Sequence, residues 1–178
     1  MKKFLQGLFF ASQVFLFAQT GTKMTNFGDG GVVISPVMQT NLDDFPRAIA
    51  VFTDNKLITT GYSTTFDQYH AYLAKYNTDG TLDTSFGNGG KVINNESFFT
   101  QYADVIAEND GKVVVCGVKT TIFSSQGHDC FVARYNANGT LDTTFGNGGF
   151  FTTALSASTD GLMRIVKLND GRYVCLAR

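Results

Sequence analysis

Short runs whose side chains would alternate between the two faces of a strand recur along the chain, and turns rich in glycine, aspartate and asparagine separate them. The clearest run spans residues 70–76, and a counterpart spans 129–135. One face of these runs carries Tyr72, Ala74 and Tyr76, or Phe131, Ala133 and Tyr135; the other carries Ala71, Leu73 and Lys75, or Cys130, Val132 and Arg134. Because both faces are largely apolar, the pattern predicts strands of sheets that are covered on both sides.

The chain contains a tandem repeat. The segment Y-N-T-D-G-T-L-D-T-S-F-G-N-G-G at 76–90 returns as Y-N-A-N-G-T-L-D-T-T-F-G-N-G-G at 135–149, a shift of 59 residues. Its last five positions also occur as F-G-D-G-G at 27–31. Repeats of this kind bury surface mainly against their neighbours, so the period predicts a stacked array of similar units.

The first two copies each contain four predicted strands, and the third contains three. The first strand is expected at 32–34, 91–93 and 150–152, the second at 47–52, 103–107 and 163–168, the third at 56–60, 112–116 and from 172 onward, and the fourth at 70–76 and 129–135. The second and third strands are joined by turns that tolerate positive φ and predict hairpins: Asp54-Asn55-Lys56, Asp110-Gly111-Lys112 and Asp170-Gly171-Arg172. The sequence therefore predicts an all-β, β-propeller-like array of four-stranded antiparallel blades, incomplete at about two and a half blades. A β-solenoid is the alternative, but its coils normally use a shorter period and parallel strands.

The repeat also sets the domain organisation. Lys2 and Lys3 precede an apolar stretch that ends at Ala18, which predicts a secretory signal peptide at 1–18, with an uncleaved membrane anchor as the alternative. This stretch is shorter than the roughly 20 residues of a membrane span, and we expect no span after cleavage. A lead-in at 19–26 is followed by blade 1 at 27–85, blade 2 at 86–144 and a truncated blade 3 at 145–178. We expect further blades of the same protein to complete the ring.

The glycine-rich stretch between the fourth strand and the next copy is expected to form the blade-to-blade crossover. Its turns begin at Asn77 and Asn136, and Phe86 and Phe145 are predicted to fill the space between blades. The repeated structural positions are Phe27, Gly28, Gly30, Gly31, Gly80, Leu82, Asp83, Phe86, Gly87, Gly89, Gly90, Gly139, Leu141, Asp142, Phe145, Gly146, Gly148 and Gly149.

The combination A-[KR]-Y-N-x-[DN]-G-T-L-D-x-[ST]-F-G-N-G-G, with a D-G-K hairpin upstream, resembles the delta-60 repeat. The resemblance covers nearly all of residues 27–178, although Lys23-Met24 departs from the Leu-Asp of the later copies. It implies a β-propeller-type fold and a bacterial secreted or cell-surface location. The resemblance implies no particular activity and no catalytic residues.

Charge and composition narrow the function classes. The chain has 14 basic and 15 acidic residues, a net charge of −1, and no Lys/Arg-rich block, so we expect no nucleic-acid partner. It has no tryptophan, whereas quinone-dependent propellers generally carry docking tryptophans, and we expect no cofactor.

Two groups of oxygen-bearing side chains are weak calcium candidates: Asn77, Asp79 and Asp83 in one copy, and Asn136, Asn138 and Asp142 in the next. Their spacing departs from an EF-hand loop because the glycine comes two residues early and no glutamate follows. The alternative is that they form Asx turns.

Cysteines, histidines and isolated acids offer little further chemistry. Cys116 and Cys130 are expected nearly opposite each other on neighbouring strands, where they would form a disulfide or remain as buried thiols. His70 and His128 lack a ligand cluster, and Asp43, Asp44 and Asp104 are expected to be solvated residues at strand edges.

These observations favour a secreted or cell-surface, non-enzymatic binding or adhesion scaffold that presents variable loops to an extracellular glycan or protein. The alternative is a polysaccharide-acting propeller hydrolase or lyase whose active site lies in other blades. A catalytic blade should break the repeat with charged residues outside the pattern, and by our reading of the sequence neither blade 1 nor blade 2 does so.

Overall fold

The computed structural model describes residues 25–37, 43–65, 68–94, 99–120, 129–153 and 161–177. The chain divides into two compact units, residues 1–33 and 34–178. In the first unit, Val32 forms isolated bridges with Gly28 and Asp29, but residues 32–34 do not form the predicted strand. The predicted signal peptide at 1–18 lies outside the described residues.

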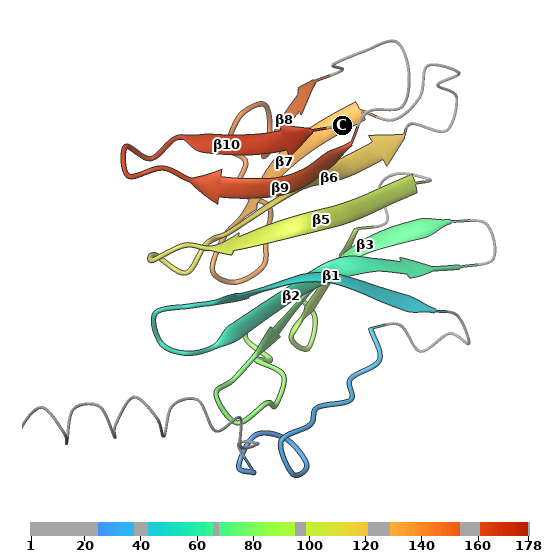
Figure 1. The fold of residues 1–178 in the computed structure, drawn as a ribbon, viewed down its shortest axis with the longest axis vertical. Helices are drawn as coiled ribbons and strands as arrows, with labels where there is room; N and C mark the ends of the chain where they lie inside the picture. Colours follow the sequence, from blue (N-terminus) through green and yellow to red (C-terminus); the bar gives the residue numbers. More distant parts are fainter. Residues whose placement is uncertain are drawn as a thin grey trace, which may run out of the picture. The chain divides into compact units, whose positions relative to one another are not determined.

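The described part of the second unit is all-β (Figure 1). Its strands are β1 (Asp44–Val51), β2 (Leu57–Thr64), β3 (Tyr69–Tyr76), β4 (Lys91–Asn94), β5 (Phe99–Ala107), β6 (Val113–Thr120), β7 (Asp129–Tyr135), β8 (Phe150–Thr153), β9 (Leu162–Lys167) and β10 (Tyr173–Ala177). Among the described residues, no helix has the length and apolar character needed to cross a membrane.

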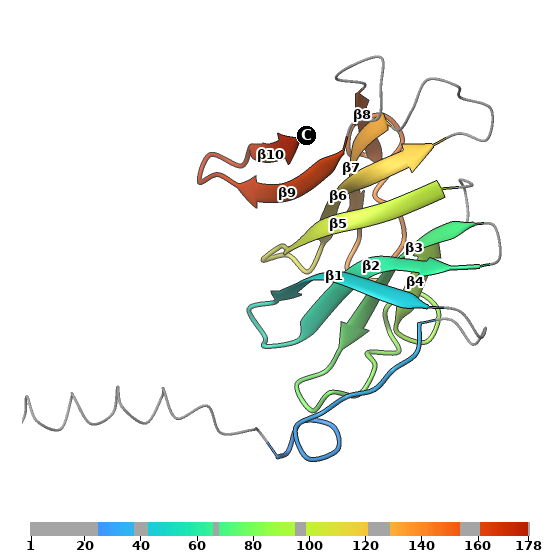
Figure 2. The ribbon, with the colours of Figure 1, turned by 45° about the vertical axis from the view of Figure 1, so that its right-hand side comes forward.

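The strands form two four-stranded antiparallel groups and one hairpin. Strands β1–β4 make the first sheet, strands β5–β8 make the second, and a single parallel pair, Tyr69 with Phe99, links them. Within the described residues, β9 and β10 pair with each other alone, and Figure 2 shows the hairpin beside the second sheet. The architecture is an incomplete β-propeller, as the repeat predicts.

The stretch 77–90 is not a crossover between blades, and this prediction was wrong. Strand β4 pairs antiparallel with β3, so the stretch joins neighbours within one sheet. Its backbone folds back onto β3, because the Asp83 N–H donates to the Lys75 carbonyl and the Lys75 N–H donates to the Gly90 carbonyl. The fourth strand of each sheet is therefore the first predicted strand of the following repeat, and the sheets span 44–94 and 99–153.

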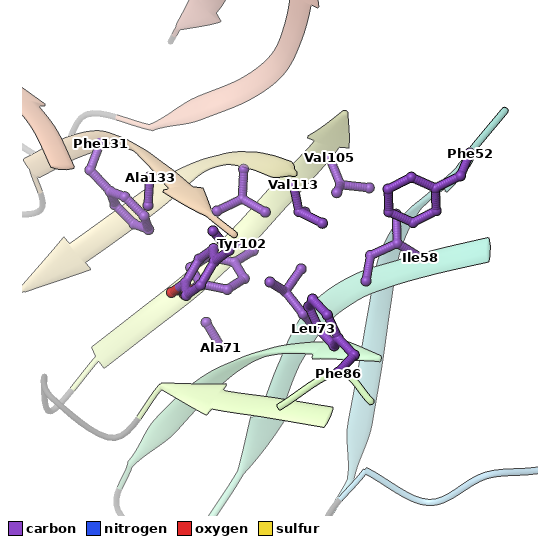
Figure 3. Close-up of a cluster of buried hydrophobic side chains, with 12 residues drawn as sticks. Phe52, Ile58, Ala71, Leu73, Phe86, Tyr102, Val105, Val113, Phe131 and Ala133 are labelled. Atoms are coloured by element: carbon purple, nitrogen blue, oxygen red, sulfur yellow. Dashed lines mark hydrogen bonds between the residues drawn. The ribbon is translucent and has the colours of Figure 1, made fainter. Parts of the chain in front are cut away.

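The sheets stack through opposite faces of their third strands. In the first cluster, Ala71 and Leu73 of β3 pack with Phe131 and Ala133 of β7, and Figure 3 shows this junction. The second cluster joins Cys130 and Val132 of β7 to Leu162 and Ile165 of β9. Each inner face thus meets the next sheet, as the alternation along residues 70–76 and 129–135 predicts.

The two repeated phenylalanines fill these junctions, as predicted. Phe86 is fully buried in the first cluster, which contains residues of both sheets. Phe145 packs at the edge of the second cluster, where its ring centroid lies 6.1 Å from that of Tyr173 in a T-shaped contact. The F-G-N-G-G motif therefore contributes an aromatic anchor between units as well as a chain reversal.

Candidate binding site

A small hollow lies at one end of β1, β5 and β9, the first strands of the two sheets and of the hairpin. Strand β5 lies between β1 and β9 (Figure 1), which brings segments far apart in the sequence together. The hollow has a volume of about 260 Å³ and is lined by Arg47, Gln101, Tyr102, Ala103, Val118, Gly161, Leu162, Met163 and Arg164.

Two arginines give the hollow a positive character. The Nη2 group of Arg47 donates a hydrogen bond to the Tyr62 hydroxyl at 3.2 Å, and its guanidinium lies 5.2 Å from the centroid of the Tyr62 ring. The ring of Tyr62 stacks on Phe45 with centroids 4.9 Å apart, and this contact positions the ring beside Arg47. The side chain of Arg164 is 66% exposed and lies 3.7 Å from the Asp104 carboxylate. The two cations therefore have different neighbours, with Arg47 on Tyr62 and Arg164 near Asp104.

Asp104 is not the solvated strand-edge residue that we expected. Its Oδ2 atom accepts a hydrogen bond from the Ile165 N–H at 3.0 Å, and its Oδ1 atom accepts one from the Val105 N–H at 3.0 Å. Asp104 therefore ties β5 to β9 and places Arg164 at the hollow. Asp44 is likewise hydrogen-bonded to the backbone, because its Oδ2 atom accepts a hydrogen bond from the Val37 N–H at 2.8 Å.

The hollow uses positions that the repeat leaves free to vary. When the repeats are aligned on the turns of Asp54, Asp110 and Asp170, three sets of equivalent positions lie at or beside the hollow. They are Phe45, Gln101 and Gly161; Arg47, Ala103 and Met163; and Ala48, Asp104 and Arg164. Every set contains three different residues, whereas the glycine and phenylalanine framework is the same in each copy. Charged residues outside the repeat pattern therefore do occur, contrary to our reading of the sequence.

Two stretches of the chain, residues 53–86 and 108–145, match a family described as "Domain of unknown function (DUF5122) beta-propeller". The chain is similar to a β-propeller family of unknown function. No curated protein matches the chain. The matched stretches run from the hairpin turns to Phe86 and Phe145, so they contain the repeated turns and the two phenylalanines but not the glycines that follow them. Apart from Val118, the residues that line the hollow lie outside them.

The weak calcium candidates take part in local turns. The Oδ1 atom of Asp79 accepts hydrogen bonds from the Thr81 N–H at 2.9 Å and hydroxyl at 2.7 Å, and Asn77 donates to the Thr81 hydroxyl at 3.0 Å. Asn136, Asn138 and Thr140 repeat this arrangement. These contacts are the Asx turns given as the alternative. In the described part of the chain, no group of three or more His, Cys, Asp or Glu side chains is placed to hold a metal ion.

Asp83 and Asp142 are the centres of two repeated ion-pair clusters. The Oδ2 atom of Asp83 accepts a hydrogen bond from Lys56 at 2.9 Å, and its Oδ1 atom accepts one from the Ser85 hydroxyl at 2.6 Å. Burial by itself raises the pKa of Asp83, but the hydrogen bonds from Ser85 and Lys56 outweigh it and lower the pKa to about 2.

The Asp142 cluster has the same design, with Arg134 at the position that Lys75 holds beside Asp83. Lys112 and Arg134 contact its Oδ2 atom at 2.8 and 2.7 Å, and the Thr144 hydroxyl donates to Oδ1 at 2.6 Å. The hydrogen bonds from Lys112 and Thr144 hold the pKa of Asp142 well below its usual range. Both carboxylates are thus hydrogen-bonded to their own repeat.

The two cysteines predicted to face each other are out of register by two residues. Cys116 pairs with Val132 across β6 and β7, and Cys130 pairs with Val118. Diagonal neighbours of this kind lie about 7–8 Å apart, which exceeds the usual Cα separation of a disulfide. Cys116 is a buried free thiol, and burial raises its pKa to about 12.

The sequence reasoning also missed a polar row across the first sheet. Asp44 pairs with Ser63, and Ser63 pairs with His70, so the three side chains follow one another across β1, β2 and β3. His70 Nε2 lies 3.1 Å from the Thr65 hydroxyl. Asp44 Oδ1, Ser63 Oγ and His70 Nδ1 are buried and have no hydrogen-bond partner among the described residues. Only the strand register reveals this row, because no local motif contains it. His128 lies outside the described residues.

Proposed function

We propose that the protein is a secreted or cell-surface β-propeller of the delta-60 type that acts as a non-catalytic binding scaffold. We further propose that its hollow takes an anionic group of an extracellular glycan, such as the carboxylate of a uronic acid. The observation that carries this proposal is that Arg47 of β1 and Arg164 of β9 line one hollow, at positions outside the repeated framework.

The chemistry of the hollow favours an acidic, hydrogen-bonding group. Guanidinium groups present several donors in a fixed plane and match a carboxylate well. Gln101 adds an amide group to the lining beside the two arginines. The hydrogen bond from Arg47 to the Tyr62 hydroxyl holds Arg47 in place. The volume of about 260 Å³ is slightly below the roughly 300–1,000 Å³ of typical ligand pockets. We therefore expect the hollow to hold a single sugar ring of a longer chain.

The lining of the hollow also supports a non-catalytic role. A glycoside hydrolase generally needs a pair of carboxyl groups that act as acid and base or nucleophile. The described residues that line the hollow include no aspartate or glutamate, and both oxygens of the neighbouring Asp104 accept backbone hydrogen bonds. The charged residues that break the repeat here are Arg47, Arg164 and the hydrogen-bonded Asp104, which do not supply the carboxyl pair that the hydrolase alternative needs.

The location forms part of the same proposal. The basic and apolar residues at 1–18 support export, and the resemblance to delta-60 repeats supports a position outside the cell. The net charge of −1 and the lack of a Lys/Arg-rich block support a partner other than nucleic acid, and the proposed role needs no cofactor.

Binding to polysaccharides of different charge tests this function. We expect the protein to bind polygalacturonate and not neutral dextran, with an affinity that falls as salt screens the arginines. Arg47→Gln and Arg164→Gln should each weaken binding about tenfold or more, because a hydrogen bond to a charged group contributes roughly 1.5–3 kcal/mol. Arg172→Gln, at an exposed arginine outside the hollow, is the matched control and should bind normally.

Two outcomes would contradict the proposal. Equal binding of dextran and polygalacturonate would show that the charge of the hollow is not used. Release of new reducing ends from polygalacturonate, sensitive to the substitutions in the hollow, would show that the protein is an enzyme.

A further inference from the structure

The first strand of each unit carries a β-bulge at the same place. The register of β1 with β2 skips Arg47, the register of β5 with β6 skips Ala103, and the register of β9 with β10 skips Met163. These three residues are equivalent in the repeat. A bulge adds one residue to a strand and redirects its side chain. We call Arg47, Ala103 and Met163 the bulge residues.

The framework around the bulge is repeated, although the bulge residue is not. Gly61 and Gly117 lie on the second strands beside the bulges of the two sheets. A Cβ atom at Gly61 would lie 2.1 Å from the Phe45 carbonyl oxygen, and one at Gly117 would lie 2.0 Å from the Gln101 carbonyl oxygen. In the hairpin, Ala177 has this place and the bulge is kept. The backbone thus forms the same bulge around an arginine, an alanine or a methionine.

All three bulge residues line the hollow. They reach it from three different strands, because β5 lies between β1 and β9 (Figure 1). Arg47 and Met163 are exposed and Ala103 is half-buried, so each can contact a ligand in the hollow. Since the fold accepts different residues at this position, the bulge residue changes the lining of the hollow without changing the strand that carries it.

The three side chains offer different chemistry. The guanidinium of Arg47 donates hydrogen bonds to an anion. The thioether of Met163 is apolar and polarisable, and it suits the C–H groups on the face of a sugar ring. Ala103 adds only a methyl group, so it takes up little of the hollow's volume of about 260 Å³. A cation, an apolar surface and open space together match a sugar ring that carries one carboxylate.

We propose that the bulge residues determine the specificity of the hollow. Arg47 selects the carboxylate, Met163 contacts the apolar face of the same ring, and Ala103 leaves room for the ring. The class of ligand rests on the proposed function, whereas the positions follow from the strand registers and the lining of the hollow. A guanidinium lost at one bulge position can therefore be supplied from another.

Moving the charge between bulge positions tests the role of Arg47, and isothermal titration calorimetry measures the affinity. Arg47→Ala should weaken polygalacturonate binding about tenfold, because it removes a hydrogen bond to a charged group. Adding Met163→Arg to this variant should recover most of that factor, since the stem of the new arginine also keeps apolar contact with the ring. Ala137→Arg, which adds the same charge in an exposed turn outside the hollow, is the matched control and should recover none of it.

The methyl ester of polygalacturonate keeps the sugar rings but lacks the charge, so it separates the roles of Arg47 and Met163. Arg47→Ala should lower the affinity for the acid much more than the affinity for the ester. Met163→Ala should lower both affinities by a similar factor of about three, because it removes only apolar contact.

Filling the hollow tests the role of Ala103. Ala103→Met should reduce the affinity at least about tenfold, because the longer side chain occupies the space that the ring needs. Ala137→Met is the control for size and should bind normally. The substitutions Arg47→Ala, Met163→Arg and Ala103→Met use residues that occupy the equivalent position of another unit. Circular dichroism should therefore show an unchanged β-sheet spectrum for each of them.

The outcomes separate this inference from the proposed function. An unmodified chain that does not bind polygalacturonate would overturn the proposed function and, with it, the ligand named here. If the unmodified chain binds but Met163→Arg recovers nothing, or Ala103→Met binds normally, then the bulge residues do not determine the specificity and only the proposed function is retained.

Discussion

Gly87 and Gly89 occupy the same tight turn but face different constraints. Both have positive φ values, +58° and +60°. A Cβ atom at Gly87 would lie 2.1 Å from the Lys91 carbonyl oxygen, whereas a Cβ at Gly89 would meet nothing within 4 Å. The equivalent Gly146 and Gly148 show the same contrast. The first glycine is therefore required by sterics and backbone conformation together, and the second by conformation alone.

This difference predicts unequal costs for two similar substitutions. We expect Gly89→Ala to lower the free energy of unfolding by about 1 kcal/mol, the usual cost of a left-handed conformation for a residue with a side chain. Gly87→Ala should cost at least about twice as much, because β4 must also shift away from the new methyl group. Urea unfolding measures both variants. Equal losses would show that the close approach to the Lys91 carbonyl contributes nothing to stability.

At the scale of elements, each Asp83-type cluster fastens a hairpin turn to the glycine-rich stretch. Lys56 at the start of β2 reaches Asp83, and Lys75 of β3 lies 4.6 Å from the centroid of the Phe52 ring and 3.8 Å from the Asp83 carboxylate. Lys112, Arg134 and Asp142 form the same arrangement in the second sheet. The T-L-D-T-[ST]-F pattern that the two copies share thus supplies the carboxylate and the hydroxyl of each cluster.

The depressed pKa of Asp83 predicts a loss of stability in acid. Its pKa is about 2 in the folded protein against an ordinary value of 3.8, so its contribution is fully present above 3.8 and is lost as the pH falls toward 2. The free energy of unfolding should therefore decrease between about pH 4 and pH 2. Asp83→Asn should make this decrease less steep, while Asp142 maintains part of it. An unchanged slope in Asp83→Asn would exclude the predicted proton linkage.

Most of the strands and hairpins could be predicted from the sequence because their signals are local. The Asp-x-[Lys/Arg] turns predicted the hairpins β1–β2, β5–β6 and β9–β10, and the alternation in β3 and β7 predicted stacked sheets. The partner of β4 could not be predicted, because a four-residue strand carries no signal for the sheet that it completes. The hollow was missed for a related reason: Arg47 and Arg164 line it together because the first sheet, the second sheet and the hairpin stack.

At the scale of the whole molecule, the two internal junctions differ in polarity. Glu108 accepts a hydrogen bond from the Tyr173 hydroxyl at 2.6 Å and is paired with Lys167, so it joins the second sheet to the hairpin. Its equivalent in the first sheet is Phe52, which packs in the first cluster. The polar contacts of Glu108 and Asp104 thus supplement the apolar contacts between the second sheet and the hairpin.

This arrangement predicts that Glu108 controls how often the hairpin separates from the second sheet. Glu108→Gln removes the ion pair with Lys167, and the loss of a charged contact at a nearly buried site costs roughly 1–3 kcal/mol. Opening should then expose Cys175 of β10 and the buried Cys116 more often. Because about 1.4 kcal/mol corresponds to a factor of ten, we expect thiol labelling of the native protein to be about tenfold faster.

The order of labelling distinguishes local opening from global unfolding. In the unmodified protein, the half-buried Cys175 should react before Cys116, which is fully buried. If the hairpin opens as a unit, Glu108→Gln should accelerate both thiols while the urea midpoint of the two sheets changes little. Asp54→Asn, in the exposed turn of the first sheet, should leave both labelling rates unchanged. Acceleration only in proportion to global instability would mean that the hairpin does not open independently, and that Glu108 stabilises the array as one cooperative unit.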